Sequence, residues 1–407
     1  MSEKLELTFV NFSKNSYITM EGRQNADRFF IIHQGKVRLS KEVEVVTEEG
    51  RDILGPGDFF AVISTMSSHS HIETAQAVTD VTLISVKKEQ YGQLIQNNTP
   101  VAMKIIMQFS KRMRYLDEAL TRLTLKNTVE NDIAHLFDVG TYYNKQGQFD
   151  QAYYAYHQYI KYCPEGKNVN QAREQMMKIA PYTKNTELVH ESDEFNREYP
   201  KNSMFFSEGE PGDELYIIQK GSVKITKIVD SNEVLLAVLK TGDIFGEMAL
   251  LESKPRSASA IAFEDSTVLA VNRTNFVRMV GTQPQIIARL TILLSERLWF
   301  IYKQLANTQI VHPLGRMYDA LLIQLEKNRV PLSLNESYVF DFGPLELFNM
   351  VGLSRTDGMP VFMKMTETGK IQVVQDKIMV MHVLEIPRQT DFFKKRNLSK
   401  TSVLGKA

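Results

Sequence analysis

The stretch "KNSMFFSEGEPGDELYIIQKGSVKI" at residues 201–225 decides the fold, because the chain contains it twice. "KNSYITMEGRQNADRFFIIHQGKVRL" at residues 14–39 matches it with one extra residue. Further along, "PGDFFAVISTM" (56–66) matches "TGDIFGEMALL" (241–251). A repeat of this length indicates two copies of one structural module.

Each copy has the pattern of short antiparallel strands. "LYIIQKGSVKIT" alternates apolar and polar residues around a glycine turn, as half-buried strands do. Short strands joined by glycine turns predict a small barrel or jelly roll. Each copy then ends in an amphipathic helix, at 99–123 and 283–307, where apolar residues recur at spacings of three and four. The chain is therefore expected to be an α+β protein with two β-jelly-roll domains.

Length and composition restrict the remaining possibilities. At 407 residues the chain is too long for a single core. Its 48 Lys and Arg balance 48 Asp and Glu, so any basic surface must be local. The single cysteine, Cys163, excludes a disulfide framework and a cysteine-ligated metal or iron–sulfur site within one chain. Because the chain has no run of about 18 apolar residues and no apolar signal core, we expect a cytoplasmic protein without a membrane partner.

The segment between the two copies, 126–185, is expected to be a helical linker. "FDVGTYYNKQGQFDQAYYAYHQYIKYCPEG" resembles a tetratricopeptide repeat. The matching positions are Gly140, Tyr143, Gly147, Ala152, Tyr156 and Pro164. One such helical pair cannot bury its own apolar face. It is therefore either a spacer packed on its neighbours or a docking site for a protein partner.

The stretch "FGEMALLESKPRSASAIA" in the second copy has two charged residues, Glu247 and Arg256, that bear on ligand binding. Gly246 lets the backbone approach a ligand closely, and the turn after it supplies backbone N–H groups for an anion. Arg256 can bind two phosphate oxygens as a fork, and Ser257 adds a hydroxyl donor. Glu247 can accept a hydrogen bond from a sugar hydroxyl. Together these groups predict a nucleotide site, and the alternative is a buried Glu–Arg ion pair that joins two strands.

This stretch resembles the phosphate-binding cassette of cyclic nucleotide-binding domains, of the form F-G-E-x-A-L-x(n)-P-R-S/A-A. The resemblance implies an eight-stranded jelly roll flanked by helices. It also implies that Glu247 binds the ribose 2′-OH and that Arg256 and Ser257 bind the cyclic phosphate. The backbone from Gly246 through Met248 to Ala249 would complete the phosphate cradle. The expected ligand is one cyclic nucleotide, without metal or haem. A serine directly after the arginine, here Ser257, is similar to the pattern of the bacterial cAMP receptors and favours cAMP over cGMP.

In this family the helix after the barrel closes over the base. Here that helix has Trp299 and Tyr302 one turn apart, and both can stack on a purine. The alternative is that both rings belong to a helix–barrel or dimer core.

The first copy lacks the polar groups of the second. A gap-free alignment from 57–86 to 242–271 places Ala61, Val62, His71 and Ile72 opposite Gly246, Glu247, Arg256 and Ser257. We therefore expect 1–125 to be a degenerate cyclic nucleotide-binding-like domain without ligand, and 186–307 to be the binding domain. His69 and His71 could form a metal or pH-sensitive element, but we expect them to be solvated surface residues.

The last segment, 308–390, has the pattern helix, turn, helix, then two alternating strands with a Gln-Asp turn, which fits a winged helix-turn-helix. Over 190–390 the chain resembles the Crp/Fnr transcription regulators. That resemblance makes Arg355, Thr356 and Lys364 the candidate DNA contacts. The tail from 391 to 407 is basic and is expected to be disordered.

The expected recognition helix departs from the family pattern. Gly358 and Pro360 fall where its first two turns should be, so we expect the helix to start late, near Thr356 or Asp357. A late start would remove the face that enters the DNA groove. DNA binding therefore remains open.

These observations lead to one main hypothesis and two alternatives. The main hypothesis is a cyclic-nucleotide-responsive regulator of the Crp/Fnr type that binds DNA, most simply as a homodimer on helix 283–307. The first alternative is a cyclic-nucleotide sensor that binds a protein partner, similar to the regulatory subunit of the cAMP-dependent kinase, with the linker 126–185 as a possible docking site. An enzyme is disfavoured because the sequence shows no nucleophile–base or metal constellation.

Overall fold

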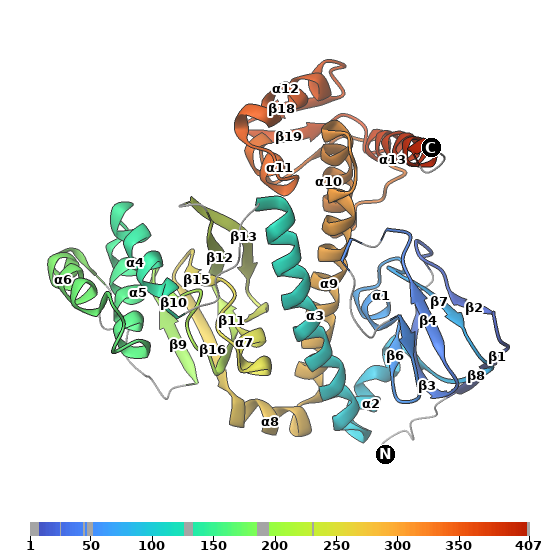
Figure 1. Ribbon diagram of the computed structural model, residues 1–407, viewed down its shortest axis with the longest axis horizontal. Helices are drawn as coiled ribbons and strands as arrows, with labels where there is room; N and C mark the ends of the chain where they lie inside the picture. Colours follow the sequence, from blue (N-terminus) through green and yellow to red (C-terminus); the bar gives the residue numbers. More distant parts are fainter. Residues whose placement is uncertain are drawn as a thin grey trace.

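The computed structural model describes residues 8–24, 26–43, 45–46, 52–125, 133–184, 195–229 and 232–404. Two β-barrels lie on either side of a pair of long helices (Figure 1). A helical unit lies beside the second barrel, and the C-terminal domain lies at one end of the long helices (Figure 1). None of the helices in these described ranges is both long enough and apolar enough to span a membrane.

The first barrel is an eight-stranded sandwich of two antiparallel sheets, with strand orders β1-β8-β3-β6 and β2-β7-β4-β5. Its strands are β1 (Thr8–Phe12), β2 (Tyr17–Thr19), β3 (Arg28–Gln34), β4 (Val37–Ser40), β5 (Ile53–Leu54), β6 (Phe59–Phe60), β7 (Thr74–Ala77) and β8 (Val81–Lys87). Short strands in two facing sheets are the arrangement expected of a jelly roll.

The second barrel repeats this arrangement with strand orders β14-β11-β16-β9 and β10-β15-β12-β13. Its strands are β9 (Asn196–Tyr199), β10 (Met204–Phe206), β11 (Glu214–Lys220), β12 (Ser222–Val229), β13 (Asn232–Lys240), β14 (Ile244–Phe245), β15 (Ser259–Ala262) and β16 (Ser266–Asn272). Strands β3 and β11 share one pattern of buried and exposed residues, and so do β8 and β16. The predicted duplication is therefore present in the fold.

The turns that the two copies share have the same backbone conformation. Gly57 and Gly242 have φ of 83° and 92°, in the region that favours glycine. Asn15 and Asn202 both have φ of 69°, which asparagine tolerates better than most residues. Because these turns need a positive φ, both copies have the same glycine or asparagine there, although other residues differ.

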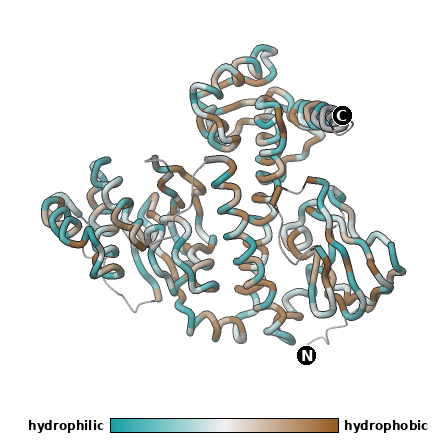
Figure 2. Tube along the Cα trace, in the orientation of Figure 1, coloured by the Kyte–Doolittle hydropathy of each residue, from teal (hydrophilic) through white to brown (hydrophobic). Residues whose placement is uncertain are grey.

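The helices of each copy follow the same plan. They are α1 (Val62–Ser67), α2 (Tyr91–Asn97) and α3 (Thr99–Leu125) in the first copy, and α7 (Glu247–Glu252), α8 (Arg273–Thr282) and α9 (Pro284–Thr308) in the second. A short 3₁₀ helix, Lys88–Gln90, precedes α2. Helices α3 and α9 pack along each other between the barrels, and both alternate hydrophobic and hydrophilic positions (Figures 1 and 2).

The two long helices are exchanged between the barrels. Helix α3 leaves the first barrel and lies against α7 of the second, whereas α9 leaves the second barrel and packs on α1 of the first. The arrangement resembles a dimer of two barrels made within one chain. The helix expected to join two chains, 283–307, is thus paired with 99–123 of its own chain, because both helices present an apolar face to the other.

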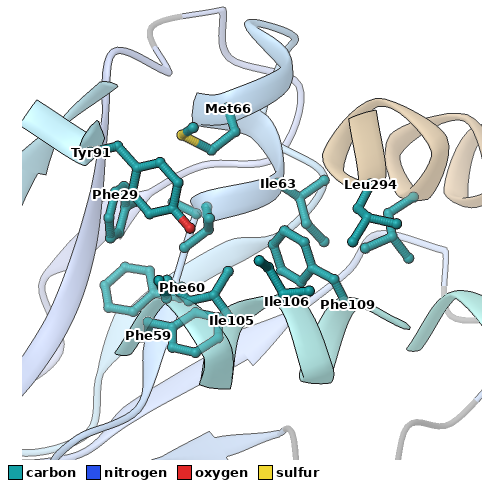
Figure 3. Packing of buried hydrophobic residues seen from close by; sticks show 14 of the residues in the cluster. Phe29, Phe59, Phe60, Ile63, Met66, Tyr91, Ile105, Ile106, Phe109 and Leu294 are labelled. Atoms are coloured by element: carbon teal, nitrogen blue, oxygen red, sulfur yellow. The ribbon is translucent and has the colours of Figure 1, made fainter. Parts of the chain in front are cut away.

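The largest hydrophobic core spans the first barrel, α3 and α9, and continues into α7, α8 and one sheet of the second barrel. Phe60 of the barrel, Ile105 and Phe109 of α3, and Leu294 of α9 are all buried in it (Figure 3). Burying a side chain of this size contributes about 1.5–3 kcal/mol. The first barrel therefore anchors both long helices.

The segment after α3 forms three helices that pack on the second barrel. These are α4 (His135–Lys145), α5 (Phe149–Tyr162) and α6 (Val169–Ile179), followed by a 3₁₀ helix, Ala180–Tyr182. Gly140 is needed where α4 meets α5, since a Cβ there would lie 2.7 Å from the Tyr156 ring. The Tyr154 hydroxyl donates to the Phe205 carbonyl at 3.1 Å, and the Gln151 amide donates to the Asn202 carbonyl at 2.8 Å. The three helices therefore form a spacer packed on its neighbours, which is one of the two interpretations of this segment. Its role as a docking site and its likeness to a tetratricopeptide repeat stay predictions.

The C-terminal domain combines four helices with a small sheet. Its elements are α10 (Pro313–Lys327), β17 (Tyr338–Val339), α11 (Pro344–Met350), α12 (Arg355–Thr366), β18 (Ile371–Val374), β19 (Lys377–Val380) and α13 (Glu385–Leu404). The strand order is β17-β19-β18. Gln375 and Asp376 both have positive φ, so they form the predicted two-residue turn between β18 and β19.

The tail expected to be disordered continues helix α13 as far as Leu404, which corrects that expectation. The Phe393 ring is buried against α10, stacked 6.2 Å from the Tyr318 ring. Lys394 Nζ lies 2.7 Å from Asp319 Oδ1 of the same helix. The apolar residue Phe393 therefore docks a helix that charge composition alone did not predict. Residues 405–407 of the expected tail lie outside the described residues.

Candidate functional site

The cassette of the second barrel begins at Gly246, between β14 and α7. Gly246 has φ of 76°, and a Cβ there would lie 2.8 Å from Arg256 Nη1 and 3.1 Å from the Glu214 carbonyl. Glycine is therefore required both for the backbone conformation and for the close approach of the arginine. No side chain caps the first turn of α7, where Met248 is half-buried and Ala249 is buried. The first backbone N–H groups of α7 therefore have no partner within the helix.

Arg256 lies inside the barrel with 4% of its surface exposed. Its Nη1 donates to the Gly246 carbonyl at 2.6 Å and to the Glu214 carbonyl at 2.9 Å. The guanidinium carbon lies 4.1 Å from the centre of the Phe206 ring. Its Nε is buried without a hydrogen-bond partner among the residues that the structure describes. A buried donor left unpaired is unfavourable by about 1–3 kcal/mol, so an acceptor supplied by a ligand would be bound favourably here.

Gly212 allows the arginine to take this position. A Cβ at residue 212 would lie only 2.2 Å from Arg256 Nε, so no other residue fits without moving the guanidinium. The backbone also fixes the loop, because Arg256 N donates to the Glu210 carbonyl and Gly209 N donates to the Arg256 carbonyl. Ser257 follows in a half-buried position. Arg256 is thus held by glycines on both sides.

Glu247 has a partner within the chain that the sequence did not predict. It is 2% exposed, and its Oε1 accepts a hydrogen bond from Arg297 Nη1 of α9 at 2.8 Å. Arg297 Nη2 also donates to the Ile244 carbonyl at 2.6 Å. The alternative of a direct Glu247–Arg256 pair is not what forms. The sequence signal for Arg297 is its position beside Glu296 in the largely apolar run "ILLSERLWF", a signal that does not by itself indicate a partner in the second barrel.

Helix α3 of the first domain adds two more charged residues to this locus. Arg114 is 3% exposed; its Nε donates to Glu252 Oε2 at 3.1 Å and its Nη1 donates to the Pro255 carbonyl at 3.0 Å. Asp117 is half-buried, and desolvation raises the pKa of its carboxyl to about 6. Neither residue could be predicted from the sequence, because a helical pattern shows which face is buried but not which barrel it meets.

Trp299 and Tyr302 do not meet Glu247 or Arg256. Trp299 is 1% exposed, its Nε1 donates to the Ser70 carbonyl at 3.0 Å, and the His69 ring stacks on it at 4.1 Å. The Tyr302 ring lies 4.6 Å below the Arg112 guanidinium. Both aromatic residues therefore pack on the first domain, as the core interpretation predicted. Arg297 is the residue of α9 that turns toward the second cassette.

The first cassette, residues 60–77, keeps the backbone conformation of the second cassette, residues 245–262. At the ligand positions it has apolar residues and His71. Gly22 N donates to the His71 carbonyl and His71 N to the Arg23 carbonyl, which reproduces the bonds around Arg256. Ala61 has φ of 64° at the position of Gly246, a conformation unfavourable for alanine by about 1 kcal/mol. Val62 and the other residues opposite the ligand positions, His71 and Ile72, are buried.

We expected the two histidines of this loop, His69 and His71, to be solvated surface residues, and the structure shows that they are not. His71 is buried, and burial with nearby cations lowers the pKa of the His69 imidazole to about 4. His69 therefore belongs to the contact between the first domain and α9, where its ring meets Trp299 and Phe300. In the ranges that the structure describes, no three His, Cys, Asp or Glu side chains come together as a metal site would require.

In the C-terminal domain, α12 starts at Arg355, so the expectation of a late start is wrong. The Ser354 hydroxyl caps the helix by accepting from Asp357 N at 3.1 Å, and Gly358 N donates to the Ser354 carbonyl. Pro360 is the sixth residue of the helix and lies on its exposed side, where water can satisfy the carbonyl that loses its partner.

The candidate DNA contacts lie on one helix. Arg355 and Thr356 are exposed in its first turn, and Lys364 is exposed near its end. The same exposed surface contains Met359, Pro360 and Met363. Its middle is therefore apolar, although charged residues lie at both ends.

Comparison with known proteins places these features in a family. A model described as "Cyclic nucleotide-binding domain" matches residues 9–98 and 196–283. The "Cyclic AMP receptor protein" of Thermus thermophilus is 30% identical over 184 residues, which are 44% of this chain and 79% of that protein. The "CRP-like cAMP-activated global transcriptional regulator" of Mycobacterium tuberculosis is 30% identical over 159 residues, 39% of this chain and 71% of that protein. The "cAMP-dependent protein kinase regulatory subunit" of Aspergillus niger is 38% identical over 91 residues, 22% of either chain.

Proposed function

The chain belongs to the Crp/Fnr family of proteins with cyclic nucleotide-binding domains, and on that premise we propose that it is a cyclic-nucleotide-responsive regulator with one working site, in the second domain. The observation that carries the proposal is Arg256, a buried guanidinium held by Gly246 and Gly212 with its Nε unpaired. A cyclic phosphate supplies the acceptor that this donor needs. The backbone N–H groups from Gly246 to Ala249 and the Ser257 hydroxyl surround the same phosphate.

Glu247 binds the ribose in this proposal while remaining paired with Arg297. A carboxylate has several lone pairs, so it can accept from a 2′-OH as well as from the guanidinium at 2.8 Å. The ion pair compensates the cost of burying Glu247. We prefer cAMP to cGMP, because Ser257 follows the arginine and relatives that match this chain are named for cyclic AMP.

Helix α9 connects the ligand site to the C-terminal domain. Arg297 ties the helix to Glu247, and ten residues later Asn307 Nδ2 donates to Asp319 Oδ2 of α10 at 2.9 Å. A nucleotide that changes the contact at Glu247 can therefore change how the C-terminal domain is held. The size of that change is limited by the difference in nucleotide affinity between the two arrangements.

Calorimetric titration of cAMP and cGMP into the wild type and Arg256→Ala tests the site. We expect one nucleotide per chain and a loss of roughly 10- to 150-fold in affinity for the variant, since a hydrogen bond to a charged group contributes about 1.5–3 kcal/mol. Arg122→Ala on α3, an exposed residue that pairs with Glu118 of its own helix, serves as the matched control. Undiminished binding by Arg256→Ala, or two nucleotides per chain, would refute the proposal.

DNA binding through α12 is the output we propose, and docking of a protein is the second candidate. The second candidate is favoured by the exposed Met359 and Met363, because flexible apolar side chains suit a protein surface better than a DNA groove. The excess of charge in 308–406, thirteen Lys and Arg over ten Asp and Glu, is small. Retention on DNA that weakens as salt is added supports the first output, and no retention at low salt excludes it.

A further inference from the structure

The structure shows that the loop before Arg256 is held by a residue of the other domain. Arg114 of α3 donates to Glu252, the last residue of α7, and to the carbonyl of Pro255, directly before Arg256. Ser110 Oγ, one turn earlier on α3, donates to Glu252 Oε1 at 2.9 Å. The contacts therefore span the loop 253–255 from one end to the other.

These contacts are buried, so they constrain the loop strongly. The Arg114 and Glu252 side chains are 4% and 2% exposed. Removing one partner of such a pair leaves an uncompensated buried charge, whereas replacing both with apolar residues is often tolerated. Arg114 Nη2 is also buried without a partner among the described residues, which places a further unpaired donor at this loop.

The first cassette has an equivalent contact, in which α9 of the second domain donates to the first domain. Residues 114 and 299 are separated by 185 positions, and so are residues 70 and 255, the same offset that relates Gly57 to Gly242. Trp299 Nε1 donates to the Ser70 carbonyl as Arg114 Nη1 donates to the Pro255 carbonyl. Each long helix thus donates to one corresponding carbonyl of the other domain's cassette; the donor is the Trp299 indole at Ser70 and the Arg114 guanidinium at Pro255.

We propose that Arg114 is a positioning residue for the nucleotide site, and that the first domain acts through α3 as a built-in partner that holds Arg256 ready for the phosphate. This inference rests on the proposed function of the second domain. In this proposal the first domain binds no ligand itself, and its role is to fix the loop 253–255 from outside the second barrel. Nucleotide affinity in the second domain then depends on how firmly α3 lies on it.

The test compares two variants that each remove one buried ion pair of α3. Arg114→Met with Glu252→Met removes the pair at the second cassette together with the bond to Pro255. Arg112→Met with Glu73→Met removes a buried pair of the same kind, 3.3 Å apart, that faces the first domain. We expect cAMP affinity to fall about 10- to 100-fold in the first variant and to stay within about twofold in the second. Circular dichroism of both full-length variants checks that they fold.

Non-additivity separates positioning from a general loss of structure. In an Arg256→Lys background, which keeps a cation but not the guanidinium fork, the Arg114/Glu252 substitutions should weaken cAMP binding less than threefold, because they act through Arg256. Wild-type affinity in the Arg114/Glu252 variant, or an equal loss in both backgrounds, would overturn the role of Arg114 while leaving the nucleotide site intact. A wild type that binds neither cAMP nor cGMP would overturn the proposed function and this inference together.

Discussion

Single residues around the second cassette form a cluster in which opposite charges compensate one another. Glu247 is paired with Arg297, and Asp117 lies within the influence of Lys227, Arg297, Glu247 and Arg114. Desolvation is the largest effect on Asp117 and raises the pKa of its carboxyl to about 6, although the nearby cations oppose it. An ionised Asp117 is therefore unfavourable in the folded protein, and this makes stability depend on pH.

We expect Asp117→Asn to stabilise the protein at pH 7.5 but not at pH 4. The folded carboxyl keeps its proton up to about pH 6, whereas the unfolded one loses it near pH 4. The wild type therefore loses stability as the pH rises from about 4 to 6, and above pH 6 the full unfavourable contribution remains. Removing the charge should raise the free energy of unfolding at pH 7.5 by about 1–3 kcal/mol.

Urea unfolding at pH 4, 6 and 7.5 checks this prediction. The control is Asp341→Asn, whose side chain is 92% exposed. If Asp117→Asn were the less stable protein at pH 7.5, the carboxylate would contribute favourably and the cluster would need another explanation.

At the scale of elements, α12 shows how packing can reverse a propensity. Gly358 is buried, and a Cβ there would lie 2.6 Å from the Phe348 ring of α11. Glycine is unfavourable in a helix by about 1 kcal/mol relative to alanine, yet here it permits the contact between the two helices. The glycine that suggested a late helix start is thus a requirement of helix packing.

We expect Gly358→Ala to destabilise the C-terminal domain by about 1–3 kcal/mol, because the added methyl group overpacks the contact with Phe348. Gly92→Ala in α2 is the matched control, since a Cβ there meets nothing within 4 Å. That substitution should instead stabilise the protein by about 0.5–1 kcal/mol. Thermal unfolding of the two variants measures both signs, and a stabilising Gly358→Ala would contradict the packing argument.

Elements differ in how far the sequence predicted them. The repeat predicted both barrels, because Gly57 and Gly242 fix the same turn and the strand pattern has period two. The amphipathic pattern predicted α3 and α9, but it could not predict that each helix lies on the other barrel. That exchange depends on contacts such as Arg114 with Pro255, which join residues 141 positions apart.

The same limit applies to the candidate site. Gly246, Glu247, Arg256 and Ser257 could be identified because they lie together in one stretch of sequence. The additional residues of α3 and α9 come from distant helices, where a charge on a helix could equally be a solvated surface residue. Trp299 illustrates a different limit: its aromatic ring suited base stacking and a packed core equally well, and only the position of α9, which directs it to His69, separates the two.

The whole molecule contains within one chain an arrangement that two copies could have formed. The apolar residues of α9, Leu290, Leu294 and Leu298, are buried with α3 and α1 in the largest core. A second chain would have to displace α3 to reach them, and would gain nothing over the intrachain pairing. The described residues also contain one copy of the α11–α12 unit per pair of barrels.

We therefore expect a monomer of 46.6 kDa at micromolar concentration, with or without cAMP. Sedimentation equilibrium of the full chain measures this mass directly. Leu294→Asp distinguishes the two possible uses of α9: in a monomer it lowers the unfolding temperature without changing the mass, because the residue lies in an intrachain core. A wild-type mass twice that of the chain, reduced to one chain by Leu294→Asp, would show instead that α9 pairs between chains and that the exchange of long helices occurs across a dimer.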